Sequence, residues 1–478
     1  MAQLAEQDVG KPEYYDAFGR VSYRIGGGTR LVGSILTSRD EFRGNSSDGS
    51  ERVEGRYRNT YLWAGWDQQW PAQVATRLLL GLTDVANDRE GRIDQPGLRS
   101  GSLDEHRSVR GGIARLDVTH SAGRWHTRAG LEGRELRAEY DFASQIEQAP
   151  GFPLPDSPAA TVVRDIESDP DGQQFGAWVT SRVGVTDGLL LEAGVRWDDQ
   201  SYDDLQGPEQ YSPRLNLLWE LEDDSRLRVA WGRFWQAQGI NELQVEDGVE
   251  TFQPAQRADH LIMSYERPLP HDIDLRLEIY QKDYDRLRSR YENLFGPNDL
   301  LPELEPDRFE VDAVRGRVRG AELSLRGTRG DAWNWWFSYA WSRAVDRVDG
   351  DDVLRSWDQQ HTLNAGLRYS GERWQFAVSE NFHTGWPITA LDTESGALGS
   401  RNAERLGNYS SLDLRIARIF ALPESRLETW LEVTGALAER KPCCYEYEST
   451  EGGGGPVITR ETEHWPRIIP SVGVLWSF

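Results

Sequence analysis

Cysteines and long apolar runs are both scarce in this sequence. The 478 residues contain only two cysteines, and because Cys443 and Cys444 are adjacent they cannot cross-link distant parts of the fold. No stretch approaches the ~20 consecutive apolar residues that a transmembrane helix needs, and the mean hydropathy is −0.65. A disulfide scaffold and a helical membrane protein are therefore excluded.

Basic residues are also in short supply. The 54 Lys and Arg residues are outnumbered by 78 Asp and Glu residues, which gives a net charge of −24. Such a chain has no basic stripe with which to neutralise phosphates, so we expect no nucleic-acid partner. Solvated loops are the simpler explanation of the acidic excess.

The sequence lacks the motifs that carry catalysis. Its eight histidines are scattered, and neither His-Glu-x-x-His nor Gly-x-Ser-x-Gly occurs. The acidic segments from Asp165 to Gly172 and from Asp346 to Asp352 could bind Ca²⁺, but they lack EF-hand spacing. We interpret both as solvated loops. We predict that the protein is not an enzyme, with no catalytic residues, no metal site and no cofactor.

The N-terminus, Met1 to Asp8, has neither the basic region nor the apolar region of a secretory signal. If the protein is exported, we expect this chain to begin inside a longer precursor.

Aromatic residues and glycines, in contrast, are abundant, with 19 Trp, 17 Tyr and 47 Gly. Apolar residues recur at every second position in many segments, as a strand with two unlike faces requires. Between Ile273 and Tyr280, for example, Ile or Leu alternates with Asp, Arg, Glu or Tyr. The pattern predicts about 19 strands, centred between residues 19 and 471, and no helix of useful length. We therefore predict an all-β chain.

The connections between these strands alternate in length. Nine short turns, beginning with residues 26–29 and 69–72, interleave with nine longer loops, beginning with residues 39–53 and 86–105. A soluble propeller or sandwich does not require short connections at one end of its strands and long connections at the other. Short turns on one side and long loops on the other are typical of strands that all cross one membrane. We predict a transmembrane antiparallel meander β-barrel in which each strand pairs with its sequence neighbours.

The last strand places Val472, Val474, Trp476 and Phe478 on one face and ends on an aromatic residue. This ending resembles the signal that the outer-membrane assembly machinery recognises, so Trp476 and Phe478 are predicted to carry an assembly signal. Phe478 would then lie at the periplasmic rim, with the short turns periplasmic and the long loops extracellular.

Several segments resemble the barrel of TonB-dependent receptors. They are Tyr14–Gly19, Tyr211–Leu217, Gln238–Leu243 with Pro254–Asp259, Arg319–Leu323, Ser356–His361, Leu431–Thr434 and the terminal Phe478. The resemblance covers essentially the whole chain, but only the barrel part of the family.

The resemblance implies a barrel of about 22 strands, a plug domain in its lumen, and a TonB box pulled by the TonB energy-transducing complex. Plug, TonB box, signal peptide and about three strands have no counterpart here. Residues 1–478 are therefore expected to be a barrel domain that is incomplete at its N-terminus. Its first and last strands run in the same direction, so we expect them not to close the barrel with each other.

Successive side chains of a strand point to opposite faces of the sheet, so odd-numbered and even-numbered residues lie on different faces. We predict that lipid-facing positions include Leu275, Leu277, Trp333, Trp335, Phe337, Leu412 and Leu414. A polar wall is predicted to face the lumen and the plug, formed by Arg276, Glu278, Glu322, Arg326, Asn364, Arg368, Asp413 and Arg415.

The adjacent cysteines fall in the last extracellular loop, near Tyr445 and Tyr447. They could form a strained vicinal disulfide or contact a ligand. A loop held in an oxidising compartment is the simpler interpretation.

The resemblance implies active import of a scarce, bulky nutrient, such as a siderophore, cobalamin or an oligosaccharide, across the cell outer membrane. Expected partners are outer-membrane lipid, a plug domain, the TonB complex and the barrel-assembly machinery. No substrate-binding residue can be named from the sequence. The alternative is a passive channel or a structural outer-membrane protein without energy coupling.

Overall fold

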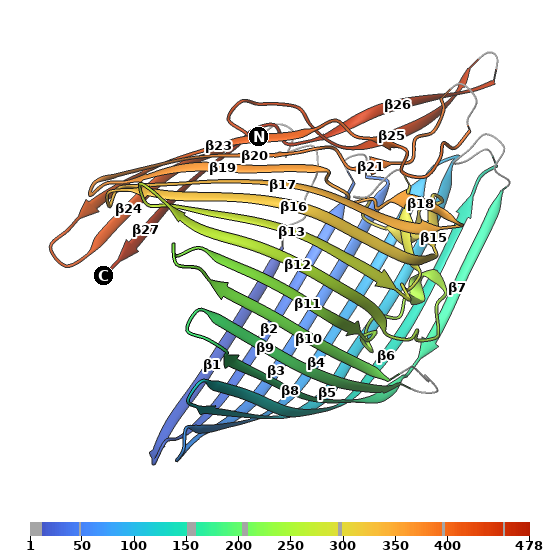
Figure 1. The fold of residues 1–478 in the computed structure, drawn as a ribbon. Coiled ribbons are helices and arrows are strands. Elements are labelled where there is room, and N and C mark those ends of the chain that lie inside the picture. Colours follow the sequence, from blue (N-terminus) through green and yellow to red (C-terminus); the bar gives the residue numbers. More distant parts are fainter. Residues whose placement is uncertain are drawn as a thin grey trace.

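One antiparallel sheet dominates the computed structural model, which describes residues 12–46, 49–150, 159–202, 209–294, 299–393, 397–452 and 455–478 (Figure 1). Of its 21 strands, β7 (Ala160–Ser168) and β18 (Asp351–Leu354) are short additions to the loop ends of β6 and β17. The other 19 form the wall, each paired with its neighbours along the chain, and the predicted meander is confirmed. Within the described ranges no helix is long and apolar enough to cross a membrane.

The wall strands have the following bounds: β1 (Glu13–Gly26), β2 (Thr29–Asn45), β3 (Glu51–Trp70), β4 (Val74–Gln95), β5 (Arg99–Ala122), β6 (Trp125–Gln148), β8 (Asp171–Gly184), β9 (Leu189–Tyr202), β10 (Gln210–Glu220), β11 (Arg226–Gln236), β12 (Gln256–Leu269), β13 (Ile273–Asp285), β16 (Ala313–Arg329), β17 (Trp333–Val348), β19 (His361–Ser370), β20 (Trp374–His383), β23 (Tyr409–Ala421), β24 (Arg426–Thr434) and β27 (Ile469–Ser477). Short hairpins lie in the loops: β14 (Arg290–Asn293) with β15 (Arg308–Val311), β21 (Pro387–Ile388) with β22 (Glu404–Arg405), and β25 (Lys441–Gly452) with β26 (Gly455–Trp465).

The N-terminal strands reach further toward the loop side than the sequence pattern indicates. β4 and β5 stay paired as far as Gln95 and Arg99, and β2 continues to Asn45. The predicted long loops over residues 39–53 and 86–105 are therefore wrong. Charged side chains occupy both faces of these extensions. The apolar alternation fades there although the backbone ladder continues.

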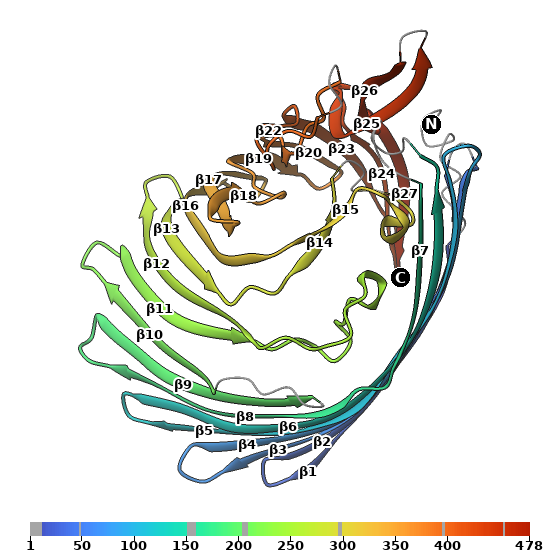
Figure 2. The same ribbon diagram turned by 90° about the vertical axis from the view of Figure 1, so that its right-hand side faces the viewer.

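The long loops identify the concave face of the sheet. Figure 2 shows two connections folding into the space that the sheet curls around. The loop after β18 places the Arg355 guanidinium 4.9 Å from the centre of the Tyr284 ring on β13. Since side chains alternate along a strand, Arg276 lies on the same concave face as Tyr284. The cross-strand register extends this assignment around the sheet.

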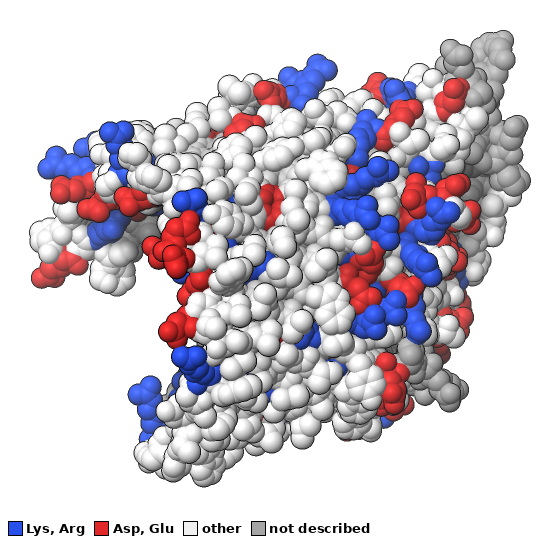
Figure 3. Space-filling view, in the orientation of Figure 1, with Lys and Arg blue, Asp and Glu red and all other residues white. Residues whose placement is uncertain are grey.

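The convex face carries an apolar belt. Leu62 on β3 lies opposite Leu82 on β4, and Leu116 on β5 lies opposite Leu131 on β6, with all four side chains exposed. Figure 3 shows a broad uncharged surface between charged residues at the two ends of the strands. An exposed apolar belt of this extent is suited to lipid contact.

Tryptophans mark the turn end of the belt. Each of them is exposed on the convex face, at the end of its strand that lies beside a short turn or, for the last strand, beside the C-terminus. They are Trp70, Trp125, Trp219, Trp333, Trp374 and Trp476. Such girdles form where a lipid-facing barrel meets the headgroups, because indole combines an apolar body with a polar N–H group.

The described sheet has two free edges. Among the described residues, β1 pairs only with β2 and β27 pairs only with β24. Unpaired backbone groups in lipid cost several kcal/mol each.

The convex assignment predicts that Leu80→Arg destabilises the barrel. Leu80 is 49% exposed in the belt, and a charge at mid-bilayer costs ~2–4 kcal/mol. Thr83→Arg, on the concave face of the same strand, should cost much less. Denaturant titration in lipid vesicles, with the folded fraction read from the gel mobility of unheated samples, measures both variants. Equal losses of stability would contradict the face assignment.

Candidate functional site

The connection between β11 and β12 folds into the lumen and packs on the wall. It contains the 3-10 helix η1 (Val245–Asp247). The Tyr140 hydroxyl on β6 donates to the Ile240 carbonyl (2.6 Å) and accepts from the Leu243 N–H group (3.2 Å). Apolar side chains from both parts form one buried cluster: Ala138, Tyr140, Phe142 and Tyr202 from the wall, Ile166 from β7, and Ile240, Leu243 and Val245 from the loop.

The connection between β13 and β16 forms a second inward-folded loop, with β14, β15 and the 3-10 helix η2 (Pro302–Leu304). Leu301 and Leu304 are almost fully buried against Val53, Ile93 and Leu103 on β3, β4 and β5. These three wall residues lie more than 190 residues before Leu301 in the chain. The extended loop ends of the N-terminal strands therefore serve as a wall for this loop.

Ion pairs join the loops to the wall and to each other. Arg308 in the second loop binds Asp247 of η1, with Nη2 and Oδ2 separated by 2.6 Å. Arg99 on β5 binds Glu305 of the second loop and lies 3.4 Å from Glu51 on β3. Little of these side chains is exposed, so screening by solvent is weak and the pairs orient the loops.

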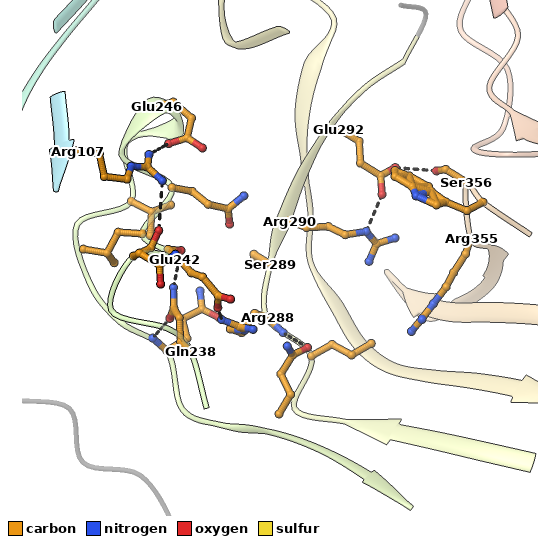
Figure 4. A pocket seen from close by; sticks show the side chains of 18 of the residues that line it. Arg107, Gln238, Glu242, Glu246, Arg288, Ser289, Arg290, Glu292, Arg355 and Ser356 are labelled. Carbon is orange, nitrogen blue, oxygen red and sulfur yellow. Dashed lines mark hydrogen bonds and ion pairs between the residues drawn. The ribbon is translucent and has the colours of Figure 1, made fainter. Parts of the chain in front are cut away.

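A cavity of about 740 Å³ lies between the two loops at the loop end of the lumen (Figure 4). Its wall includes Arg107 from β5, Glu242 and Glu246 from the first loop, and Arg288 and Arg290 from the second. Ala344, Arg355, Ser356 and Trp357 complete the opposite side. The volume falls in the range of ~300–1,000 Å³ that is usual for small-molecule sites.

The arginines in this cavity are held by acids. Arg107 lies 3.1 Å from Glu246, and Arg288 lies 2.8 Å from Glu242. Arg290 lies 2.6 Å from Glu292, whose other oxygen accepts a hydrogen bond from Ser356 (2.7 Å). Each guanidinium has five N–H donors and can bind more than one acid, and Arg107 also pairs with Glu105 (2.8 Å).

The pKa values of the two acids of the first loop, Glu246 and Glu242, shift in opposite directions. Burial raises the pKa of Glu246 above its usual value, although Arg107 opposes the effect. At Glu242 burial also raises the pKa, but hydrogen bonds from Arg288 and from the Gly239 N–H group outweigh it and the net pKa is lowered. Glu242 is therefore the more firmly ionised of the two at neutral pH.

The expected solvated loop from Asp346 to Asp352 is wrong at its first acid, because Asp346 is buried, whereas Asp349, Asp351 and Asp352 are exposed. Asp346 is 2% exposed on β17, and it lies 3.0 Å from Arg290 and 2.8 Å from Arg355. Its position on the concave face next to the second loop makes it an anchor for two cavity arginines.

The residues of the predicted polar wall lie on the concave face, at different heights along their strands. Arg276 binds Glu278 (2.5 Å), and Glu278 lies opposite Glu322 in the ladder. Arg326 binds Asp274 (3.0 Å), Arg368 donates to Gln375 (3.4 Å), Asp413 accepts from Ser411 (2.9 Å) and Arg415 binds Glu428 (3.3 Å), while Asn364 lies opposite Ser338 and Asn381. They are spread along the interior and do not line the cavity.

The residues proposed as an assembly signal are accessible. Phe478 is 97% exposed and Trp476 is 61% exposed, with their ring centroids 5.6 Å apart. Both lie at the turn end of the sheet.

Sequence reasoning did not identify the cavity residues. The sequence marks Gln238–Leu243 and Ser356–His361 only as family-like segments, and it gives no signal for Arg107, Arg288 or Arg290. An arginine in a loop is common, and only the inward fold of the loops brings these three together.

Comparison with known proteins identifies the family. The family model described as TonB dependent receptor-like, beta-barrel, matches residues 7–424. The chain belongs to this family. No curated protein matches the sequence.

Solved structures of such receptors share the fold. The unliganded ferric citrate transporter FecA is 15% identical, with a TM-score of 0.64 and coverage of 98% of this chain and 71% of FecA. The ferripyoverdine receptor of Pseudomonas aeruginosa, bound to ferripyoverdine, is 12% identical, with a TM-score of 0.63 and coverage of 98% and 66%. The copper transporter OprC is 13% identical, with a TM-score of 0.67 and coverage of 98% and 71%. The receptor barrel described here thus spans 66–71% of these chains.

Two buried acids make the second loop sensitive to pH. Burial, together with neighbouring carboxylates, raises the pKa of Asp299 to about 8, and burial raises that of Glu305 to about 7 despite its bond to Arg99. Both folded-state values exceed the unfolded ones, so this contribution to stability is complete below pH ~4 and is lost as pH rises through about 7 to 8.

Hydrogen exchange in residues 299–312, corrected for intrinsic rates, should therefore be faster at about pH 9 than at about pH 5. Combining Asp299→Asn with Glu305→Gln should remove most of this dependence. Glu310→Gln, which changes an exposed acid of the same loop, should not. Protection of the native loop that does not change with pH would contradict the prediction.

The first loop should be loosened by Tyr140→Phe. Losing the hydroxyl leaves the Ile240 carbonyl and the Leu243 N–H group buried without this partner, at a cost of ~1–3 kcal/mol. Limited proteolysis within residues 237–255 should become at least several-fold faster. Tyr211→Phe, at an exposed position on β10, is the matched control, and equal acceleration by both variants would count against the anchoring role.

Proposed function

We propose that this chain is the barrel of an outer-membrane receptor that imports a scarce, bulky nutrient with energy from the TonB complex. The cavity at the loop end of the lumen is the observation that carries the proposal. A passive channel needs an open path, whereas here two loops fold inward and are tied to the wall and to each other. This arrangement favours ligand capture before transport.

The lining of the cavity favours an anionic metal chelate of siderophore size over cobalamin or a neutral oligosaccharide. Arg107, Arg288, Arg290 and Arg355 contribute planar, permanently charged donors that suit the carboxylate or other anionic oxygens of such a chelate. Two structurally similar receptors are named for ferric citrate and ferripyoverdine, which supports the same class.

The polar wall has a separate role in this proposal. A barrel of this size leaves a lumen that must be filled or it conducts water. The mixed charges on the concave face, from Arg276 to Arg415, suit contacts with the polar surface of a plug domain. TonB would act on the receptor through that plug, and the exposed pair of Trp476 and Phe478 would be the contact for the barrel-assembly machinery.

Replacing two cavity arginines tests the ligand class. Charge-assisted hydrogen bonds contribute about 1.5–3 kcal/mol each. The Arg288→Ala and Arg290→Ala variants of the receptor should therefore each bind the cognate ferric chelate at least roughly tenfold more weakly. Fluorescence quenching with a panel of ferric citrate, catecholate and hydroxamate chelates measures affinity. Arg347→Ala, at an exposed arginine outside the cavity, should bind as the native receptor does.

Uptake of radioactive iron by cells expressing the receptor tests energy coupling. We expect accumulation that disappears in cells without TonB. Equal uptake in both strains would support a passive channel instead. Tight binding of cobalamin or an oligosaccharide, with no ferric chelate bound, would overturn the ligand class but leave import intact.

A further inference from the structure

The adjacent cysteines lie at the base of the hairpin formed by β25 and β26. In a regular strand, neighbouring side chains point to opposite faces, so two adjacent sulfurs should lie far apart. Here the Sγ atoms of Cys443 and Cys444 are 3.0 Å apart. A local irregularity in the backbone must therefore bring them together.

A β-bulge is that irregularity. Pro442 pairs with His464 and Cys444 pairs with Glu463, so Cys443 is an additional residue without its own partner in the ladder. Two residues of β25 consequently oppose one residue of β26, an arrangement that re-aims a side chain. The two thiols and the Glu463 carboxylate provide three ligand atoms within 4.8 Å of one another.

We propose that Cys443, Cys444 and Glu463 bind a tetrahedral, thiophilic divalent cation of the Zn²⁺ class. Two thiolates are soft ligands that select such ions over Ca²⁺ or Mg²⁺, for which oxygen ligands are the rule. Three protein ligands leave a fourth position for water, as in open zinc sites.

The spacing of the sulfurs favours a tetrahedral ion over a linear one. Two Zn–S bonds of about 2.3 Å at a tetrahedral angle place the sulfurs ~3.7 Å apart, roughly 0.7 Å more than in this structure. Linear coordination requires roughly twice one metal–sulfur bond, or ~4.6 Å. Adjacent residues reach the shorter separation with less backbone movement.

The surroundings permit binding by thiolates. Cys443 is 5% exposed, whereas Glu463 is exposed and keeps the site open to solvent. Binding of the ion releases one proton from each thiol.

The site would stabilise the hairpin where it meets the barrel. Lys441, two residues before Cys443, is buried and donates to Ser411 on β23 (3.0 Å). Further along β25, the Tyr447 hydroxyl accepts from the Leu391 N–H group (3.0 Å) in the preceding loop. An ion bridging β25 and β26 at the bulge would hold the hairpin over the loop end of the last strands, outside the cavity.

Cobalt substitution tests the site in the purified receptor, reduced and kept free of oxygen. Co²⁺ should give a sulfur-to-cobalt charge-transfer band and the d–d bands of a tetrahedral complex, saturating at one ion per chain. Excess Zn²⁺ should abolish both. Zn²⁺ should also protect both thiols from a maleimide reagent, which mass spectrometry can measure.

Variants separate the ligands from their neighbours. The double change Cys443→Ser and Cys444→Ser should abolish the charge-transfer band and weaken Zn²⁺ binding at least roughly a hundredfold. Glu463→Gln should keep the band but lower affinity about tenfold or more and alter the d–d bands. Glu461→Gln, two residues away on β26, is the matched control and should change neither. Heat-modifiable mobility confirms that each variant is folded.

Three outcomes would overturn the proposal. The first is native receptor with no charge-transfer band at saturating Co²⁺. The second is equal affinity in the double serine variant, which would show adventitious binding by loop acids only. The third is binding of Cu⁺ with no binding of Co²⁺ or Zn²⁺, which would exclude the tetrahedral class.

Discussion

The wall depends on backbone hydrogen bonds between neighbouring strands. In lipid no water can bond to an unpaired N–H or C=O group, so every strand needs a neighbour on each side along its whole membrane span. The continuous ladder from β1 to β27 satisfies this requirement for all wall strands except the outer sides of the two edges. The alternating side chains, the short turns and the curl of the sheet are all compatible with that ladder.

A wall built in this way has a large interior, and the loops partly fill it. The first and second loops enter the concave side because they carry apolar residues, such as Leu243 and Leu301, that find buried positions only against the wall. The loops also bring charged side chains into the lumen, where these side chains form ion pairs, such as that between Arg308 and Asp247. The cavity between the loops is therefore a product of apolar anchoring at its sides and ion pairing along its lining.

Sequence reasoning succeeded where the two faces of a strand meet different surroundings. Between Ile273 and Tyr280 the two faces of the strand have different surroundings, so apolar and polar residues alternate and the pattern predicts the strand. It failed over residues 86–105, where the strands continue but charged side chains stand on both faces, although Ile93 and Leu103 pack against the second loop. It also failed at Asp346, because an acid in a glycine-containing segment looks solvated until Arg290 and Arg355 are found beside it. The adjacent cysteines indicated nothing definite until the bulge at Cys443 placed both sulfurs beside Glu463.

The sequence by itself determined the class of fold and the 19 wall strands. These features are local, since each side chain responds to the medium on its own side of the strand. Only the tertiary structure decided the cavity and its ion pairs. Arg107 meets Glu246 across 139 residues of chain, and Arg99 meets Glu305 across 206. Such contacts depend on how far the sheet curls and how deeply the loops enter it, and no periodicity within a single segment encodes either quantity.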